Sequence, residues 1–316
     1  MNQQTDDERR ERERIRRRRA ARRRQIVLRR RLMLAGATLL MVIILGGVIR
    51  NALADSSKNE SKSESAKKVT IDPEEQESSK EVEESTATLF TAGDIIMHKP
   101  FLTSPAYYKE DGTYDYNPIF TYVKSYLESA DFAVTTLECA LTDGDYSGYP
   151  TFHSPDAIAE ALAANGVDMC LLANNHIYDN GDEGLQRTMD VMTQNSLLYA
   201  GTRKTTSDKT YTIQDIGGIK VGFFNYVFET EEVNGQKTIN GIAVTDESAP
   251  LINSFQSNDL ESFYREIETG LEEMEAEGVE FTVAYMHWGI EYQTEESEEQ
   301  DAMAQRLCDM GIDALI

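Results

Sequence analysis

Polar side chains that can bind a metal ion follow four apolar stretches of the sequence. The apolar run 167–173 is followed directly by Asn174, Asn175 and His176, and the other three runs end in an aspartate, a glutamate and a histidine. Carboxylate, amide and neutral imidazole ligands together suit Mn, Fe or Zn better than calcium, which prefers oxygen ligands alone. The polar residues at the four ends are Asp94, Glu138, His287 and the run Asn174, Asn175 and His176, and we expect them to converge on a site for a divalent ion.

The apolar stretches have the length and composition of β-strands. In open α/β sheets, ligands bind at the carboxyl ends of the strands, which is where the polar residues lie. Each residue alone also has a structural explanation, as a turn residue or a hydrogen-bonded core histidine. All four histidines of the chain lie in or beside these stretches, which favours a common site for one ion or two. The predicted strands cover residues 88–93, 132–138, 167–173 and 281–286.

Predicted helices alternate with these strands after residue 87. Residues 154–166 have the marks of a helix, with Ser154 as N-cap, Pro155 at the first helical position and Gly166 as the stop. Two glycines, Gly217 and Gly218, predict a hairpin between apolar segments. This alternation predicts an α/β domain. Further helices are expected at 183–195, 259–277 and 296–310.

The chain before this domain divides into three segments. Residues 1–31 hold 14 arginines against five acidic residues. Residues 32–49 are apolar and uncharged, and at about 1.5 Å per residue a helix there would span roughly 27 Å, close to a bilayer core of about 30 Å. The basic flank predicts a cytoplasmic tail, and hence an extracellular domain. Residues 50–86, rich in Ser, Glu and Lys without an aromatic residue, predict a disordered linker.

Other interpretations of these segments remain open. The small residues at 52–54 also fit a signal-peptidase site, so the apolar segment is either an anchor or a cleaved signal. An arginine-rich tail can bind RNA, but beside a membrane segment its simplest role is contact with anionic lipid, so we expect the cell membrane and no nucleic acid as a partner. The final residues, GIDALI, look like the approach to another strand, and we expect the sequence to continue beyond Ile316.

The ordered motifs TAGDIIM, TLECALT, ANNHIYDNG and MHWGIEY resemble those of the bacterial capsule synthesis family CapA (PgsA), which is involved in making or exporting poly-γ-glutamate. The resemblance covers residue 88 to the end. It implies a metallophosphoesterase-like sandwich of two sheets flanked by helices, behind an N-terminal membrane anchor. It also implies a metal centre formed by Asp94, Glu138, Asn175, His176 and His287, with Asp179 and Glu291 beside the ligands or facing the substrate.

The sequence departs from the phosphoesterase pattern in three places. The Asp-x-His motif is absent, because Asp94 is followed by Ile95 and Ile96, and His98 comes four residues later. Glu138 stands where most phosphoesterases have aspartate, as it does in the CapA family. The final Gly-His-x-Pro-His type motif would have to follow Ile316.

Three functions are compatible with these features. The first is capsule polymer synthesis and export, together with other capsule-synthesis membrane proteins. The second is a metal-dependent phosphoesterase of the cell envelope, with His176, Asp179 and Glu291 as catalytic residues. The third is a binding scaffold without catalysis. After residue 50, 16 lysines or arginines stand against 50 acidic residues, a net charge of −34, so contact with an anionic polymer requires metal or local cations.

Overall fold

The computed structural model describes residues 85–316. The predicted cytoplasmic tail (1–31), the predicted transmembrane helix (32–49) and nearly all of the predicted linker (50–86) lie outside the described residues and stay predictions. Within residues 85–316, no helix combines the length and the apolar character that crossing a bilayer requires.

The first sheet has four parallel strands in the order β1-β2-β5-β6. Parallel neighbours need a crossover connection, and helices fill the three connections here. One face of this sheet packs against helices and the other against the second sheet, so all six residues of the central strand β2 are buried. The strands are β1 (Leu89–Ile95), β2 (Phe132–Leu137), β5 (Met169–Leu171) and β6 (Leu198–Ala200), and the helices are α3 (Lys124–Ser129), α4 (Ala157–Ala164) and α5 (Gly181–Gln194).

The second sheet has the order β12-β8-β13-β14, with β7 also paired to β8. The β7–β8 hairpin is confirmed, and Gly217 and Gly218 both have positive φ (61° and 86°), which a tight two-residue hairpin turn favours. Two helices belong to this half of the domain, α6 (Leu260–Glu277) and α7 (Glu298–Met310). The strands are β7 (Tyr211–Ile216), β8 (Ile219–Phe228), β12 (Ser254–Phe255), β13 (Phe281–His287) and β14 (Ala314–Leu315).

The two sheets pack face to face through one buried apolar cluster, with residues from β2, β5 and β6 on one side and from β7, β8 and β13 on the other. Alternation along the strands separates this cluster from the helix-facing ones. On β13, Val283 and Tyr285 face the opposite sheet, whereas Ala284 and Met286 pack against the helices. A hydrogen bond of 2.8 Å between the Thr91 and Tyr285 hydroxyls also crosses between the sheets.

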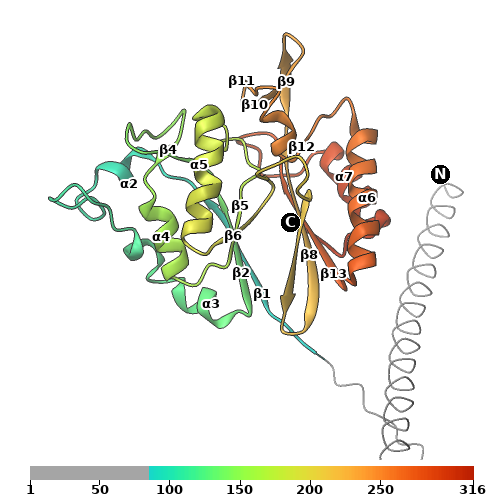
Figure 1. Ribbon diagram of the computed structural model, residues 1–316, viewed down its shortest axis with the longest axis horizontal. Coiled ribbons are helices and arrows are strands. Elements are labelled where there is room, and N and C mark those ends of the chain that lie inside the picture. The colour runs from blue at the N-terminus through green and yellow to red at the C-terminus, as the bar shows by residue number, and fades with distance from the viewer. Residues whose placement is uncertain (1–84) are drawn as a thin grey trace, which may run out of the picture. The chain divides into compact units, whose positions relative to one another are not determined.

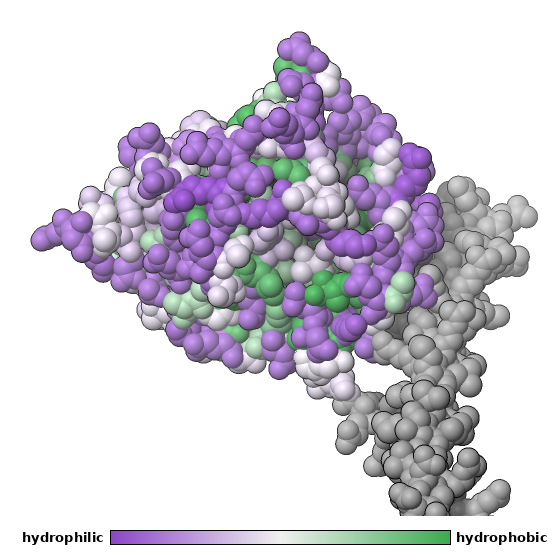
Figure 2. All heavy atoms as spheres, in the orientation of Figure 1, coloured by the Kyte–Doolittle hydropathy of each residue, from purple (hydrophilic) through white to green (hydrophobic). Residues whose placement is uncertain are grey.

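Helices cover both outer faces of this pair of sheets. Figure 1 shows α3, α4 and α5 on the side of the first sheet and α6 and α7 on the side of the second. The predicted α/β class is confirmed. The polar outer residues of these helices and loops make most of the face in Figure 2 hydrophilic, with hydrophobic residues in small patches.

The remaining elements are short and lie at the ends of the sheets. A three-stranded antiparallel sheet, β9 (Thr230–Val233), β10 (Gln236–Ile239) and β11 (Ile242–Ala243), follows β8. The two-residue strands β3 (Ala140–Leu141) and β4 (His153–Ser154) pair beside α5. The last are α2 (Lys99–Thr103) and two 3₁₀ turns, η2 (Asn117–Phe120) and η3 (Ala249–Leu251).

The predicted start of the helix at 154–166 is wrong. Ser154 pairs with Leu141 in a β-ladder, so the helix α4 begins only at Ala157, with Asp156 at the N-cap. The Asp156 carboxylate does not cap the helix, because it accepts a hydrogen bond of 2.7 Å from Arg187 of α5. Tertiary pairing therefore overrides the local capping signal at this position.

Candidate metal centre

The carboxyl ends of the two sheets meet at one edge of the domain. His287 is the last residue of β13, and Asp94 is the penultimate residue of β1. Glu138 follows β2 directly, and Asn175 lies a few residues after β5. These four residues therefore come together at the carboxyl ends of strands from both sheets, where ligands bind in α/β proteins. They span almost 200 positions of the sequence.

A β-bulge turns the end of β1 toward this edge. The β1–β2 register shifts between Thr91 and Asp94, so β1 has one more residue than its partner at this point. The hydroxyl of Thr135 donates a hydrogen bond of 2.8 Å to the carbonyl of Gly93, which fixes the bulged backbone. Bulges commonly redirect a side chain beside a functional site, and this one carries the Asp94 side chain to the cavity.

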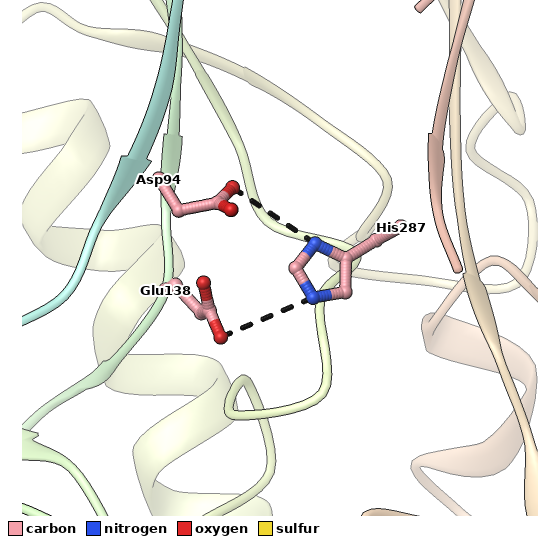
Figure 3. Close-up of side chains that lie close together, drawn as sticks. All are labelled: Asp94, Glu138 and His287. Carbon is pink, nitrogen blue, oxygen red and sulfur yellow. Dashed lines mark ion pairs between the residues drawn. The ribbon is translucent and has the colours of Figure 1, made fainter. Parts of the chain in front are cut away.

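Asp94, Glu138 and His287 form a cluster in which one ligand atom of each lies within 4.8 Å of the others. Figure 3 shows the His287 ring between the two carboxylates. Its Nδ1 lies 4.0 Å from Oδ1 of Asp94, and its Nε2 lies 3.9 Å from Oε1 of Glu138. These separations are too long for hydrogen bonds, so the three groups surround a shared space without bonding to one another.

Glu138 is the most perturbed acid of the cluster. Its side chain is only 9% exposed, although it borders a cavity. Burial raises the pKa of Glu138 from 4.5 to about 7, with repulsion from Asp94 as the next cause and the nearby His176 acting in the opposite direction. A carboxylate held in its charged form at such a position requires a nearby cation.

His287 has the properties of a metal ligand. Burial lowers the pKa of His287, and His176 adds to this effect, while Asp94 opposes it. The neutral ring is the form that binds metal. The amide oxygen of Asn175 lies 2.8 Å from Nε2 of His287, so this predicted ligand adjoins the cluster and fixes the ring.

The residues of the cluster fit a divalent ion. Within residues 85–316, neither the Asp94 nor the Glu138 carboxylate accepts a hydrogen bond, and no lysine or arginine lines the cavity of about 420 Å³ around them. Two oxygen donors, one imidazole and an adjacent amide oxygen match the mixed ligand sets of Mn, Fe and Zn. The three residues could therefore hold a divalent ion.

His176 lies beside the cluster, with one ring nitrogen already engaged. Its Nδ1 lies 2.7 Å from Oδ2 of Asp179, and its Nε2 lies 3.9 Å from Oε1 of Glu138. Asp179 is held in turn by the backbone N–H of Phe152 at 2.6 Å. The arrangement is a buried imidazole–carboxylate pair whose Nε2 faces Glu138, and the three-residue cluster does not include this predicted ligand.

The other predicted residues take more peripheral positions. Glu291 is exposed, lines the same cavity and contributes to the raised pKa of Glu138. His153 contacts the backbone carbonyl of Asp179 at 3.2 Å, and His98 packs edge-on against Phe152 with ring centroids 4.9 Å apart. His98 is not part of the cluster, so the geometry gives no support to it as a replacement for the missing Asp-x-His histidine.

Two further amides position the site: Asn174, which the sequence places among the polar residues after the run 167–173, and Asn225, which sequence reasoning missed. The side chain of Asn174 donates to the carbonyl of Leu137 (2.8 Å) and accepts from the N–H of His176 (3.0 Å), which builds the turn after β5. Asn225, from β8 of the other sheet, bonds both the N–H and the carbonyl of Ala173 and also the carbonyl of Tyr285. It therefore ties the turn that carries His176 to the strand that carries His287.

Comparison with known proteins gives two matches. The chain is 23% identical over 248 residues to a protein described as "Capsule biosynthesis protein CapA" from Bacillus anthracis, a match that covers 74% of this chain and 54% of the relative. The chain thus spans about half the length of this curated relative. The family model described as "Bacterial capsule synthesis protein PGA_cap" matches residues 88–316. This confirms the resemblance read from the motifs, and the chain belongs to the bacterial capsule synthesis family PGA_cap.

Proposed function

We propose that this chain is a membrane-anchored, extracytoplasmic protein that acts in the synthesis and export of a capsule polymer, poly-γ-glutamate or a related one, through a metallophosphoesterase-like metal centre. Membership of the capsule synthesis family, and the description of the Bacillus anthracis relative as a capsule biosynthesis protein, support the role in capsule synthesis. The apolar segment 32–49 behind an arginine-rich tail supports the anchor. The observation that supports the metal centre is the cluster of Asp94, Glu138 and His287, in which no lysine or arginine from the described part of the chain neutralises the two carboxylates.

In this proposal, Asp94, Glu138 and His287 hold the ion, and Asn175 completes the ligand set or orients His287. When bound, a divalent ion supplies Lewis-acid activation of a phosphoryl or carboxyl oxygen. Because Glu138 is buried, its attraction to the ion acts in a low-dielectric environment and is stronger than in water. The His287 ring is neutral, so its nitrogen is available as a ligand.

Phosphoester hydrolysis is the second candidate function, because the His176–Asp179 pair faces the cluster. Asp179 accepts from Nδ1 of His176 and so places the remaining proton or lone pair on Nε2, which lies 3.9 Å from Oε1 of Glu138. A protonated Nε2 is positioned to donate to a leaving oxygen, and Asp179 would stabilise the charged ring. Glu291, on the cavity rim, is the group that would contact the rest of the substrate.

Charge constrains how an anionic polymer would contact the domain. With a net charge of −34 after residue 50 and no lysine or arginine among the residues that line the cavity, the described surface offers such a polymer no fixed cation at the site. A bound ion would provide the positive charge. The proposal therefore requires polymer binding to depend on metal.

The test combines metal analysis of the purified full chain with poly-γ-glutamate binding. We expect stoichiometric Mn, Fe or Zn in the wild type, loss of that metal in Asp94→Asn/Glu138→Gln, and retention in the charge-matched control Glu268→Gln/Glu272→Gln, whose exposed side chains lie on α6. Polymer binding should disappear in excess chelator. Binding that is unchanged by chelator, or equal metal content in all three proteins, would contradict the proposal.

A further inference from the structure

The metal centre opens into a longer groove. Its cavity of about 420 Å³ shares Asn175, His287, Trp288 and Glu291 with a neighbouring cavity of about 710 Å³. That cavity continues along β8 into a third of about 420 Å³. The three cavities therefore adjoin one another through shared lining residues, and together we name them the groove.

The groove beyond the metal centre offers hydrogen-bond acceptors and amides but no positive charge. Glutamates 231, 232, 295 and 296 are exposed along it, and the amides of Asn240, Gln293 and Gln256 lie between them. No lysine or arginine of the described residues lines any of the three cavities. Carboxylates accept hydrogen bonds and cannot donate them, so a ligand must bring hydroxyl or amino donors and no negative charge.

Aromatic side chains supply flat surfaces within the same groove. Trp288 and Tyr292 lie on the same loop after β13, both line the cavity of about 710 Å³, and Tyr292 is 95% exposed. Trp288 packs edge-on against the buried Phe255, and Phe228 lines the second and third cavities. The faces of aromatic rings carry partial negative charge and therefore pack well against the C–H faces of sugar rings.

The backbone holds Tyr292 in this exposed position at some cost. Its φ is 65°, a left-handed conformation that is uncommon for a bulky residue, and Gly289 turns the chain just before it with φ of 108°. Backbone strain of this kind clusters at ligand-binding sites, because folding stability alone does not favour it. An exposed aromatic ring on a strained loop beside a cavity is thus the second feature that indicates a ligand.

We propose that this groove binds a glycan chain without negative charge, with sugar hydroxyl or amino groups donating to the glutamates and amides and with ring faces packing on Tyr292 and Trp288. Planar aromatic surfaces beside acceptor side chains match a polyhydroxylated chain. Among the described residues, the charged side chains that line the two cavities beyond the metal centre are all glutamates, so they repel a polyanion there. This binding does not depend on the ion, so the proposal stands apart from the metal-dependent function above.

The test measures binding of three six-unit probes to the full chain by titration calorimetry in excess chelator. The probes are N-acetylglucosamine hexamer, its de-N-acetylated cationic form, and hexa-γ-glutamate. We expect both sugar hexamers to bind and the anionic peptide not to bind. Tyr292→Ala should weaken sugar binding about fivefold. The matched control is Tyr122→Ala, which removes an 89% exposed tyrosine outside the groove and should change nothing.

A second pair of variants separates recognition from general attraction to an acidic surface. Glu295→Gln/Glu296→Gln should weaken the neutral hexamer about tenfold, whereas Glu268→Gln/Glu272→Gln on α6 should leave it unchanged. Four results would overturn the proposal: no binding of either sugar hexamer, equal binding of hexa-γ-glutamate, equal effects of the two tyrosine variants, or equal effects of the two glutamate pairs.

Discussion

Replacing Glu138 by Gln should change the stability of the metal-free protein in the opposite direction from that of the metal-bound protein. The buried carboxyl has its pKa raised from 4.5 to about 7, so its charged form is disfavoured in the folded state. A carboxyl with a raised pKa stabilises the fold below pH 4.5 relative to higher pH, and this stabilisation is lost as the pH rises through 7. Glutamine keeps the shape and removes the charge.

The size of the effect follows from the pKa shift. At 1.36 kcal/mol per pH unit, the shift corresponds to an upper limit of about 3 kcal/mol. Because the carboxyl borders a cavity open to water, screening reduces the expected gain to roughly 1–2 kcal/mol. The metal-free Glu138→Gln protein should therefore exceed the wild type in free energy of unfolding by that amount at pH 8 and match it near pH 4.5.

Denaturant titrations of the full chain, in chelator at both pH values and in excess Mn²⁺ or Zn²⁺ at pH 8, measure the effect. Metal at 100 times its Kd stabilises a protein by about 2.7 kcal/mol, and a variant that has lost a ligand gains less. The ranking of wild type and variant should thus reverse when metal is added. If Glu138→Gln instead destabilises the metal-free protein at pH 8, the carboxylate is satisfied by the protein and the metal-centre reasoning is wrong.

Three further predictions test the surroundings of the cluster. His176→Ala in a chain that turns over phosphoesters should abolish turnover while leaving metal content unchanged, and an undiminished rate would remove His176 from the mechanism. Asn225→Ala leaves two buried backbone groups of Ala173 without partners, so we expect a loss of about 2–4 kcal/mol in unfolding titrations together with weaker metal binding, and an unchanged metal affinity would refute its positioning role. Gly201→Ala places a Cβ 2.1 Å from Oδ1 of Asn225, so thermal unfolding should show a loss of more than about 2 kcal/mol, whereas Gly235→Ala, with open space around it, should cost less.

The sequence carried enough information to predict the cluster because parallel strands impose a simple geometry. Parallel strands of one sheet end at a common edge, so Asp94 and Glu138 could be placed together without knowing the pairing order. His287 ends a strand of the second sheet, and its approach to them depends on the packing of the two sheets. The distinction between His176 and His287 could not be made in this way. It depends on Asp179, which binds the ring of His176 and is itself held by the N–H of Phe152, in a loop whose path no local pattern specifies.

Positions that join the two sheets were also beyond the reach of sequence reasoning. Asn225 lies within an apolar run of β8 and reads as an isolated polar residue, yet its amide contacts Ala173, 52 positions away. Its role follows only once the two sheets face each other. The same holds for Ser154, whose capping signal is real in isolation but is overridden by β-pairing with Leu141. Local signals predicted the elements, whereas contacts between layers decided the details.

The candidate metal cluster and the groove have opposite electrostatic requirements. At the cluster, the buried Glu138 and the exposed Asp94 have no lysine or arginine of residues 85–316 beside them, and a bound ion would be the positive charge that an anionic polymer can reach. Along the groove, exposed glutamates make the lining negative. A polyanion and a donor-rich chain would therefore occupy adjacent positions without competing, one at the ion and one in the groove, and the side chains of Trp288 and Glu291 would lie at their boundary.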